Sequence, residues 1–463
     1  MRIPQRPINY INLAHPRDVS KKDAVHAAHR EKPKPHNPVP SAAPTAPTLL
    51  RPPPAALTKR RTLEERANLI SLGTESLDSL CAAVAEDGKL FTWGNVSSGA
   101  LGHGSRDRAS KPTEVKGALD GKRVKSVACG AYQTLALTDD GQLFEWGATF
   151  STYEEKSGGR SIRVLSCLLY KCDNDKLEPT LVRGFLTGLR VKRVAAGKYH
   201  ALAVVEDGRL FSWGYGGMGA LGHGNTVNEP LPRQVQGVVA AKRVVEVAGG
   251  DQISLALAED GTVFSWGKQY WGREFSTTQD DSKPNEVSGL TGTAVACGGC
   301  HNLVLTEAGA IFAWGANQRG QLGLGHTNTN HSNRPVGVRG KLAHKRVEVV
   351  AAGHLTSAAV TDDGCVYTWG NERSLPTLKL GMLAEPQLAC GCDRMAIVSV
   401  TGTLMEWNTS TIAYSQEARD VNGMPRMFVG PTASTRKGDG AGRRSAGEVD
   451  ENECPACQET FLS

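Results

Sequence analysis

Cysteines at short separations are the residues of this chain best suited to metal chemistry. Cys454 and Cys457 are separated by two residues, the spacing of half a tetrahedral zinc site. A structural zinc normally takes four ligands, so this pair alone is incomplete. Cys167 and Cys172 also fall outside the repeat pattern described below. A zinc ion shared by these four thiols is an open hypothesis, and we otherwise expect no cofactor.

A second closely spaced pair, Cys297 and Cys300, points away from metal binding. Cys297 directly precedes a glycine of the repeated strand, and Cys129 and Cys390 hold the same repeat position, where alanine also occurs. A cysteine at a repeat position that alanine fills in other copies is interpreted as a small core residue. The chain has 11 cysteines, an odd number, and shows no secretory signal peptide, which favours a reducing intracellular compartment.

Histidines and nucleotide motifs give no support for an active site. His200 and His301 occupy one repeat position, which Gln133 fills elsewhere, so we interpret them as hydrogen-bonded structural residues. The sequence contains no phosphate-binding G-x-x-x-x-G-K-[ST] motif, no G-x-S-x-G nucleophile motif and no H-E-x-x-H zinc motif. We therefore expect that the chain is not an enzyme with its own catalytic centre.

Basic residues at a fixed place in the repeat are candidates for partner binding. An arginine opens the same strand in four units, and a lysine precedes it in three: Arg123, Arg190, Arg243 and Arg346, with Lys122, Lys242 and Lys345. A shared repeat position places all of them on one face or rim of the fold. They predict either a broken basic arc for an acidic partner or ordinary solvated edges.

These residues are positioned by a unit that occurs seven times along the chain. Each copy consists of an apolar strand, a turn ending in Gly, and a second strand ending in Trp, as in LALTDDGQLFEWG. Seven of the eight tryptophans occupy this one position: Trp93, Trp146, Trp213, Trp266, Trp314, Trp369 and Trp407. The Asp-Gly dipeptide of five copies supplies the positive-φ residues of a tight hairpin turn.

The flanking segments complete each unit. A strand of the form Arg-Val-x-x-Val-Ala-x-Gly precedes the hairpin, and a Gly-x-Leu-Gly-x-Gly loop follows it in three copies, at 99–104, 219–224 and 320–325. About 50 residues with three to four strands are typical of one propeller blade. We therefore predict an all-β fold, a seven-bladed β-propeller over residues 73–410.

The repeat resembles that of the regulator-of-chromosome-condensation family, whose seven-bladed propeller includes the exchange factor for the GTPase Ran. The resemblance covers roughly residues 73–410 and implies the fold. Members of the family also serve as ubiquitin-ligase modules, a plant ultraviolet receptor, ciliary scaffolds and mitochondrial proteins, so the resemblance does not specify a function.

An insertion interrupts the second unit over residues 148–178. It adds about 14 residues between Trp146 and the next repeat glycine. In the Ran exchange factor a wedge-like projection follows a similar unit, although the Gly-Ser-Phe-Arg-Asp run associated with it is absent here. The segment is interpreted either as a solvated loop or as a partner-binding projection, with Tyr153, Glu154 and Glu155 as candidate contact residues.

The end units depart from the repeat. The first lacks a glycine eleven residues before Gly88, where Leu77 stands, and the last ends in Trp407-Asn408. Such ends suggest that closure of the ring brings the two ends of the repeat region together. We expect residues near 73–94 and 395–408 to lie in neighbouring blades.

The N-terminal residues differ in composition from the rest of the chain. Twelve of the 23 prolines lie in residues 1–60, and residues 1–70 carry 13 basic and five acidic side chains. A Pro-rich, charged segment cannot bury a core, so we predict an extended tail at 1–60. Capping-box sequences favour short helices near 21–31 and 63–72, making 61–72 a short helix or linker. Residues 411–463 form the predicted C-terminal tail.

The sequence is compatible with two functions. The first is a non-catalytic scaffold, a subunit of a larger intracellular assembly that binds proteins through blade loops, the insertion and the tails. The alternative is a guanine-nucleotide exchange factor for a small GTPase, which needs no catalytic acid or base. Nucleic-acid binding is not favoured, and no run is long enough to span a membrane. The expected location is the cytoplasm, with cytoskeleton, cilium, mitochondrion and nucleus as open alternatives.

Overall fold

Alternation of apolar side chains over four to six residues, bounded by glycine turns, produces short antiparallel strands throughout the chain. The computed structural model describes residues 70–73, 80–94, 98–148, 175–267, 281–327, 332–380, 387–391, 394–398 and 404–408. For residues 152–157, 160–165, 333, 407–408 and 419–420 it describes the backbone alone. The predicted tail helix at 21–31, the tail 1–60 and most of 411–463 lie outside these residues.

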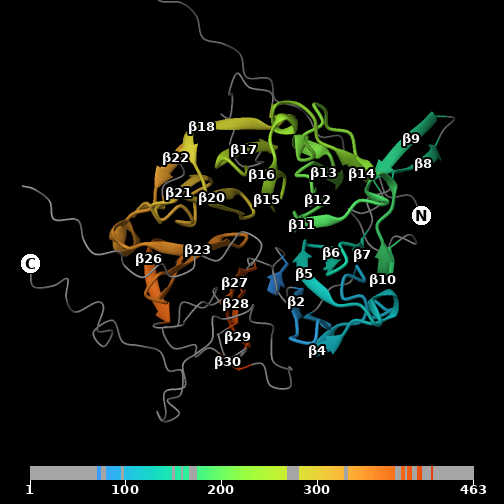
Figure 1. Ribbon diagram of the computed structural model, residues 1–463, viewed down its shortest axis with the longest axis horizontal. Coiled ribbons are helices and arrows are strands. Elements are labelled where there is room, and N and C mark those ends of the chain that lie inside the picture. Colours follow the sequence, from blue (N-terminus) through green and yellow to red (C-terminus); the bar gives the residue numbers. More distant parts are fainter. Residues whose placement is uncertain are drawn as a thin grey trace, which may run out of the picture. The chain divides into compact units, whose positions relative to one another are not determined.

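The strands form seven four-stranded sheets, each a blade of consecutive repeat strands (Figure 1). Blade 1 holds β1 (Ile70–Leu72), β2 (Cys81–Val84), β3 (Leu90–Gly94) and β4 (Ala109–Glu114). Blade 2 holds β5 (Val124–Cys129), β6 (Gln133–Thr138), β7 (Leu143–Gly147) and β10 (Lys176–Leu181). Blade 3 holds β11 (Val191–Ala196), β12 (His200–Val205), β13 (Leu210–Gly214) and β14 (Glu229–Gln234).

The other four blades repeat this order. Blade 4 holds β15 (Val244–Gly249), β16 (Ile253–Ala258), β17 (Thr262–Gly267) and β18 (Asn285–Thr291). Blade 5 holds β19 (Ala294–Cys297), β20 (His301–Leu305), β21 (Ile311–Gly315) and β22 (Ser332–Gly337). Blade 6 holds β23 (Val347–Ala352), β24 (Thr356–Thr361), β25 (Val366–Gly370) and β26 (Arg373–Leu380). Blade 7 holds β27 (Gln387–Cys390), β28 (Arg394–Val398), β29 (Leu404–Asn408) and β30 (Arg419–Asp420).

The first strand of each blade contacts the first strand of the next, and β27 contacts β1, so the ring closes. This confirms the predicted seven-bladed propeller. The expected proximity of residues 73–94 and 395–408 is also observed, because Ala83 and Trp93 share a buried cluster with Ala396 and Leu404. Among the described residues no helix is long and apolar enough to cross a membrane.

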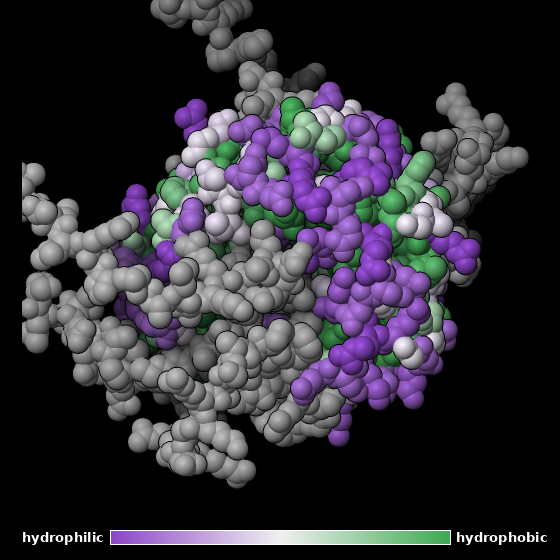
Figure 2. All heavy atoms as spheres, in the orientation of Figure 1, coloured by the Kyte–Doolittle hydropathy of each residue, from purple (hydrophilic) through white to green (hydrophobic). Residues whose placement is uncertain are grey.

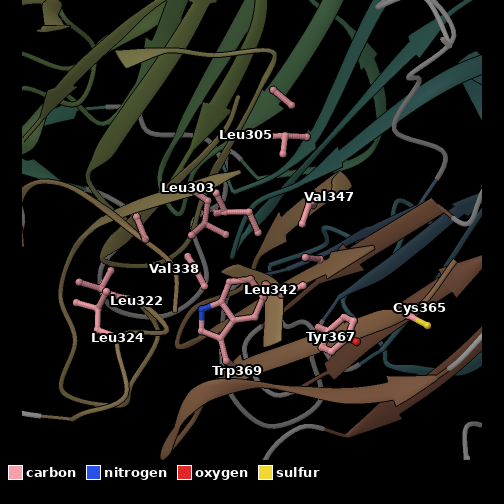
Figure 3. Close-up of a cluster of buried hydrophobic side chains, with 14 of the residues drawn as sticks. Leu303, Leu305, Leu322, Leu324, Val338, Leu342, Val347, Cys365, Tyr367 and Trp369 are labelled. Atoms are coloured by element: carbon pink, nitrogen blue, oxygen red, sulfur yellow. The ribbon is translucent and has the colours of Figure 1, made fainter. Parts of the chain in front are cut away.

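The core lies between blades, as seven buried clusters that each join two neighbouring sheets. In the cluster between blades 5 and 6, Trp369 of β25 packs among Leu322, Leu342 and Val338 (Figure 3). Removing such apolar area from water is the main stabilising contribution to the ring.

A glycine at the end of each first strand allows the blades to meet at the centre. A Cβ atom added to Gly353 would lie 1.9 Å from the carbonyl oxygen of Gly391, and one added to Gly298 would lie 2.4 Å from that of Gly353. The same approach recurs around the whole ring, through Gly73, Gly130, Gly197 and Gly250. Only glycine lets the backbones approach this closely.

Blade 1 corrects one expectation. Residues 70–72, the end of the segment predicted to be a short helix or linker, form β1, the inner strand of the ring. The central glycine of this blade is Gly73, whose N–H donates to the Leu80 carbonyl, seven residues later. In blade 2 the matching bond joins Gly130 to Gln133, three residues later. The longer loop between β1 and β2 places Gly73 further from the hairpin turn than in the other blades. The glycine therefore does not fit the regular spacing of the repeat.

Candidate functional site

The two faces of the ring carry different connections. Successive strands are antiparallel, so the links between first and second strands share a face with those between third and fourth strands. We call this the loop face, and it includes the insertion between β7 and β10. The opposite turn face carries the Asp-Gly turns and the short 3-10 connections η2 (Gly117–Leu119), η3 (Gly184–Leu186), η5 (Val238–Ala241) and η6 (Gly340–His344). The remaining described 3-10 element, η4 (Gly217–Gly219), lies on the loop face.

The predicted basic arc lies on the turn face and is engaged in bonds between blades. Arg123 donates from Nη1 to the Asp87 carbonyl at 2.7 Å and from Nη2 to the Glu86 carbonyl at 3.0 Å, so it holds the turn of the preceding blade. Arg243 donates to the Glu206 carbonyl at 2.7 Å in the same way. Arg190 donates to the Asp139 carbonyl at 3.3 Å, and Arg346 packs over the turn glycine Gly309.

The lysines of the arc pair with carboxylates of the Asp-Gly turns. Lys242 Nζ lies 2.5 Å from Asp260 Oδ2, Lys345 Nζ 2.7 Å from Asp363 Oδ2, and Lys122 Nζ 3.7 Å from Asp140 Oδ2. Lys345 and Thr361 donate to Asp363 and thereby lower its pKa to about 2, although its burial opposes the shift. The arc is therefore a ring of paired charges with a structural task, and partner binding by it stays a prediction.

Tryptophans of the repeat join neighbouring blades on the loop face. Trp146 Nε1 donates to the Ala100 carbonyl at 2.8 Å, in the Gly-x-Leu-Gly-x-Gly loop of the preceding blade, and Thr134 Oγ1 donates to the same oxygen. The arrangement recurs where Trp266 binds the Ala220 carbonyl and Trp369 binds that of Gln321. The glycine-rich loops are thus structural turns fixed by the next blade.

The repeat histidines extend this network, as the sequence predicts. His200 Nε2 lies 2.8 Å from Ser254 Oγ, whose single proton goes to the Ala220 carbonyl. The histidine must therefore carry its proton on Nε2, and its buried Nδ1 has no hydrogen-bond partner. Burial lowers the pKa of His200 to about 4 and, at the matching position beside Ser357, that of His301 to about 3.

At the insertion the tryptophan contact changes. Blade 2 has no glycine-rich loop after its third strand, and Trp213 Nε1 donates instead to Glu145 Oε1 at 2.9 Å. The other oxygen of this carboxylate accepts from Lys176 Nζ at 3.1 Å. Next to it, Arg106 Nη2 donates to the buried Asp175 Oδ2 at 2.7 Å. Two charged pairs therefore fix the point at which the insertion returns to the ring.

The insertion itself contains a two-stranded hairpin, β8 (Thr152–Ser157) paired with β9 (Arg160–Leu165). Figure 1 draws this hairpin at the rim, on the side where β14 lies. The candidate contact residues Tyr153, Glu154 and Glu155 lie in β8, opposite residues 162–164 in the register. Their backbone alone is described, so their contact role stays a prediction.

Three tyrosines line the loop face next to the start of this insertion. The rings of Tyr132 and Tyr199 stack at 5.7 Å between centroids, and Tyr199 meets Tyr215 edge-on at 5.9 Å. Lys198 Nζ lies 5.2 Å from the centroid of the Tyr199 ring. The N–H of Ala148, where the insertion begins, donates to the Tyr132 carbonyl at 2.8 Å. We call Tyr132, Tyr199 and Tyr215 the tyrosine row.

The described cysteines behave as core residues. Burial raises the pKa of Cys129 and Cys300 to about 12, and it also raises that of Cys297 and Cys390. Among the described residues no group of three or more His, Cys, Asp or Glu side chains is placed to hold a metal ion. The candidate zinc ligands Cys454, Cys457, Cys167 and Cys172 lie outside the described residues.

The repeat geometry agrees with a family model described as an RCC1-like domain, which matches residues 51–339. The chain belongs to this family. A curated RCC1-like relative is the human E3 ubiquitin-protein ligase HERC2, 36% identical over 339 residues, which are 71% of this chain and 7% of that protein. Other curated relatives are matched over 6% to 60% of their length, so the chain spans less than two thirds of each.

Solved propellers agree with the RCC1-like fold. Human WBSCR16 is 26% identical with a TM-score of 0.58, and the match covers 72% of this chain and 87% of that one. Prp20p from Saccharomyces cerevisiae is 20% identical with a TM-score of 0.57, over 78% of this chain and 87% of that one. At this identity the likeness to Prp20p shows the fold alone.

Within this RCC1-like propeller, sequence reasoning located the insertion but missed the tyrosine row. Tyr132 and Tyr199 hold the same repeat position, two residues after the central glycine, and this periodicity was the available signal. The two predicted groups of contact residues also prove to be separate. The basic arc lies on the turn face, whereas Tyr153, Glu154 and Glu155 belong to the insertion on the loop face.

Proposed function

We propose that this RCC1-like propeller is a non-catalytic protein-interaction subunit of a larger assembly, and that it binds its partner through the loop face of blades 2 and 3. The observation that carries the proposal is the hairpin β8–β9, which leaves the ring at Ala148, next to Tyr132 of the tyrosine row. Tyrosine is enriched at protein interfaces because its ring offers a large, rigid contact area with a polar end.

Electrostatics also favour this face over the turn face. The basic residues of the turn face are paired with turn carboxylates and carbonyls of the protein itself. Because these charges already have opposite charges beside them within the protein, they offer a weaker field to an acidic partner. On the loop face two charged pairs, Lys176–Glu145 and Arg106–Asp175, fix the point where the insertion returns to the ring before a partner arrives.

The test is affinity purification of the full-length protein with three variants, each compared with the wild type. In the first, residues 151–166 are replaced by a Gly-Ser linker, which keeps Asp175 and Lys176. The second is Tyr132→Ala with Tyr199→Ala, and the third, Leu375→Asp on β26, is the control on the outer rim. We expect the first two to lose the stoichiometric partner proteins and the control to retain them. Retention by all three variants would contradict the proposal.

A second candidate function is guanine-nucleotide exchange on a small GTPase. The hairpin supports it, because it follows the unit that resembles the one preceding the wedge of the Ran exchange factor. The solved relative Prp20p is described with its binding to Gsp1p and histones. An exchange factor releases nucleotide by binding the empty GTPase more tightly than the loaded one.

Exchange kinetics distinguish this candidate from the scaffold. If the purified partner is a GTPase, release of a fluorescent GDP should accelerate with the wild-type chain and not with the variant that lacks 151–166. A partner that is not a GTPase, or equal release with both proteins, leaves the scaffold as the function.

A further inference from the structure

Large apolar side chains are exposed on the outer rim where blades 2 and 3 meet. Phe185 in η3 is 72% exposed, Leu231 in β14 is 55% exposed and Leu181 at the end of β10 is 38% exposed. A Cβ atom on Gly184 would lie 3.5 Å from Leu231 Cβ, so η3 rests on β14. Figure 2 shows apolar residues at the rim beside β10 and β14. We call Leu181, Phe185 and Leu231 the rim patch.

The equivalent positions at other seams between blades can be compared with this patch. At the seam of blades 1 and 2 the glycine of η2 faces Glu178, and Ala118 follows it. At the seam of blades 5 and 6 the glycine of η6 faces Leu375, and Lys341 follows it. At the seam of blades 3 and 4 no atom lies within 4 Å of a Cβ on Gly237, and the exposed Val238 follows it. Of these four described seams, only the one between blades 2 and 3 places large apolar side chains at both positions. Packing of the ring therefore does not require them, which points to a ligand.

The segment that carries Phe185 is basic, and Glu229 of β14, two residues from Leu231, is paired with Arg233. Residues 179–193 contain four Lys or Arg and no Asp or Glu. Arg183 and Arg190 flank Phe185 along the chain, and both are exposed. A ligand of this patch should therefore carry acidic groups next to apolar anchors.

Backbone pairing with the outer strands is blocked. Pro230 and Pro232 lie in β14, and Pro179 lies in β10, so these positions have no N–H to offer an added strand. The ligand must therefore bind through side chains rather than by extending a sheet.

The C-terminal segment of this chain has the required chemistry. Residues 446–463 contain five acidic and no basic residues, and they end with Phe461, Leu462 and a serine. From Asp420 to Glu448 the chain reaches about 90 Å when extended. Four strands spaced about 4.8 Å apart place the rim roughly 20 Å from the centre of the ring. We propose that residues 446–463 dock on the rim patch, with Phe461 and Leu462 against Phe185 and Leu231 and the acidic residues beside Arg183.

Site-specific cross-linking in the full-length protein tests this docking. Phe461→benzoylphenylalanine places a photoreactive group in the segment, and mass spectrometry maps its cross-links. We expect them in residues 181–193 and 229–241. Phe185→Asp should lower their yield about tenfold, the loss expected when roughly 1.4 kcal/mol of contact free energy is removed. Because Phe185 is 72% exposed, this variant should keep the melting temperature of the wild type.

Matched variants make the result decisive. Leu375→Asp changes a rim position of blade 6 that is 41% exposed and should leave the yield unchanged. Cross-links within one chain and between isotopically distinguished copies both place the segment on the patch. Cross-links that map to the basic residues 1–60, that scatter over the ring, or that persist with Phe185→Asp would overturn the proposal.

Discussion

At the scale of single residues, the buried histidines make the stability of the ring depend on pH. His200 and His301 have folded pKa values of about 4 and about 3, below the ordinary 6.5. The unfolded chain therefore binds more protons below pH 6.5, and stability is lost as pH falls from 6.5 toward these values. Each histidine should cost about 1.4 kcal/mol per pH unit in that window.

Chemical denaturation between pH 7 and pH 5 measures this dependence. The double variant His200→Gln with His301→Gln should lose clearly less unfolding free energy over the interval, because it removes both titrating groups. Glutamine already stands at this position in blade 2, where Gln133 Nε2 donates to the His200 carbonyl. Parallel pH curves for variant and wild type would refute the role assigned to the histidines.

Glu145 joins blade 3 to the end of the insertion. Its carboxylate accepts from Trp213 and Lys176, and Trp213 is 3% exposed. Glu145→Ala leaves the buried indole N–H without a partner and should lower the unfolding free energy by about 1–3 kcal/mol. Hydrogen exchange in residues 175–181 should also accelerate, because the base of the insertion loses a charged pair. Glu86→Ala, on an exposed turn, is the control, and equal effects of the two variants would contradict this role.

At the scale of elements, the central glycines decide whether blades can meet. Gly353→Ala would place a Cβ atom 1.9 Å from the Gly391 carbonyl oxygen, so the two inner strands must separate. We expect a loss above about 4 kcal/mol, the range reached by mutations that disrupt a close backbone approach. Gly337→Ala, with no atom within 4 Å and no positive φ, should change stability little. Thermal unfolding of both proteins provides the comparison, and similar melting temperatures would contradict the account.

The arginines of the turn face act as links between blades. Arg243→Met removes the bond to the Glu206 carbonyl and the pair with Glu259. The side chain is 42% exposed, so the expected cost is only about 1 kcal/mol. Partner binding should be retained, because this role is structural. A variant of unchanged stability that no longer binds partners would restore the basic arc as a docking site.

The sequence was sufficient for the elements that repeat and insufficient where spacing changes. Seven Trp positions and the Asp-Gly turns predicted seven blades, because local turn chemistry and periodicity are both encoded within one unit. The strand β1 was missed because a four-residue-longer loop moved Gly73. The hairpin β8–β9 was also missed, although the sequence Gly158-Gly159 is a dipeptide favoured in two-residue hairpin turns.

Contacts between blades are harder to predict from sequence than the blades themselves. The bond from Trp146 to Ala100 spans 46 residues, and the stacking of Tyr132 on Tyr199 depends on the angle between two sheets. Neither follows from a pattern within one repeat. The sequence therefore identifies the insertion as a candidate site. The tyrosine row is recognised only once the arrangement of the blades in the ring is known.

At the scale of the whole molecule, the propeller is a closed ring whose irregular features gather in one sector. Blades 2 and 3 carry the insertion, the tyrosine row and the rim patch, whereas the paired charges of the turn face occur in several blades. Such a division suits a subunit that is held on one side by a larger assembly. The native size of the protein in its own cells tests this directly.

Size-exclusion chromatography of a gentle cell extract, with detection of the tagged chain, is the measurement that we would make first. The account predicts that the 49.4 kDa chain elutes within a much larger complex. The variant in which a Gly-Ser linker replaces residues 151–166 should elute near its own mass, and Leu375→Asp should behave as the wild type. Elution of the wild-type chain as a free monomer, or an unchanged large complex with the linker variant, would contradict the account.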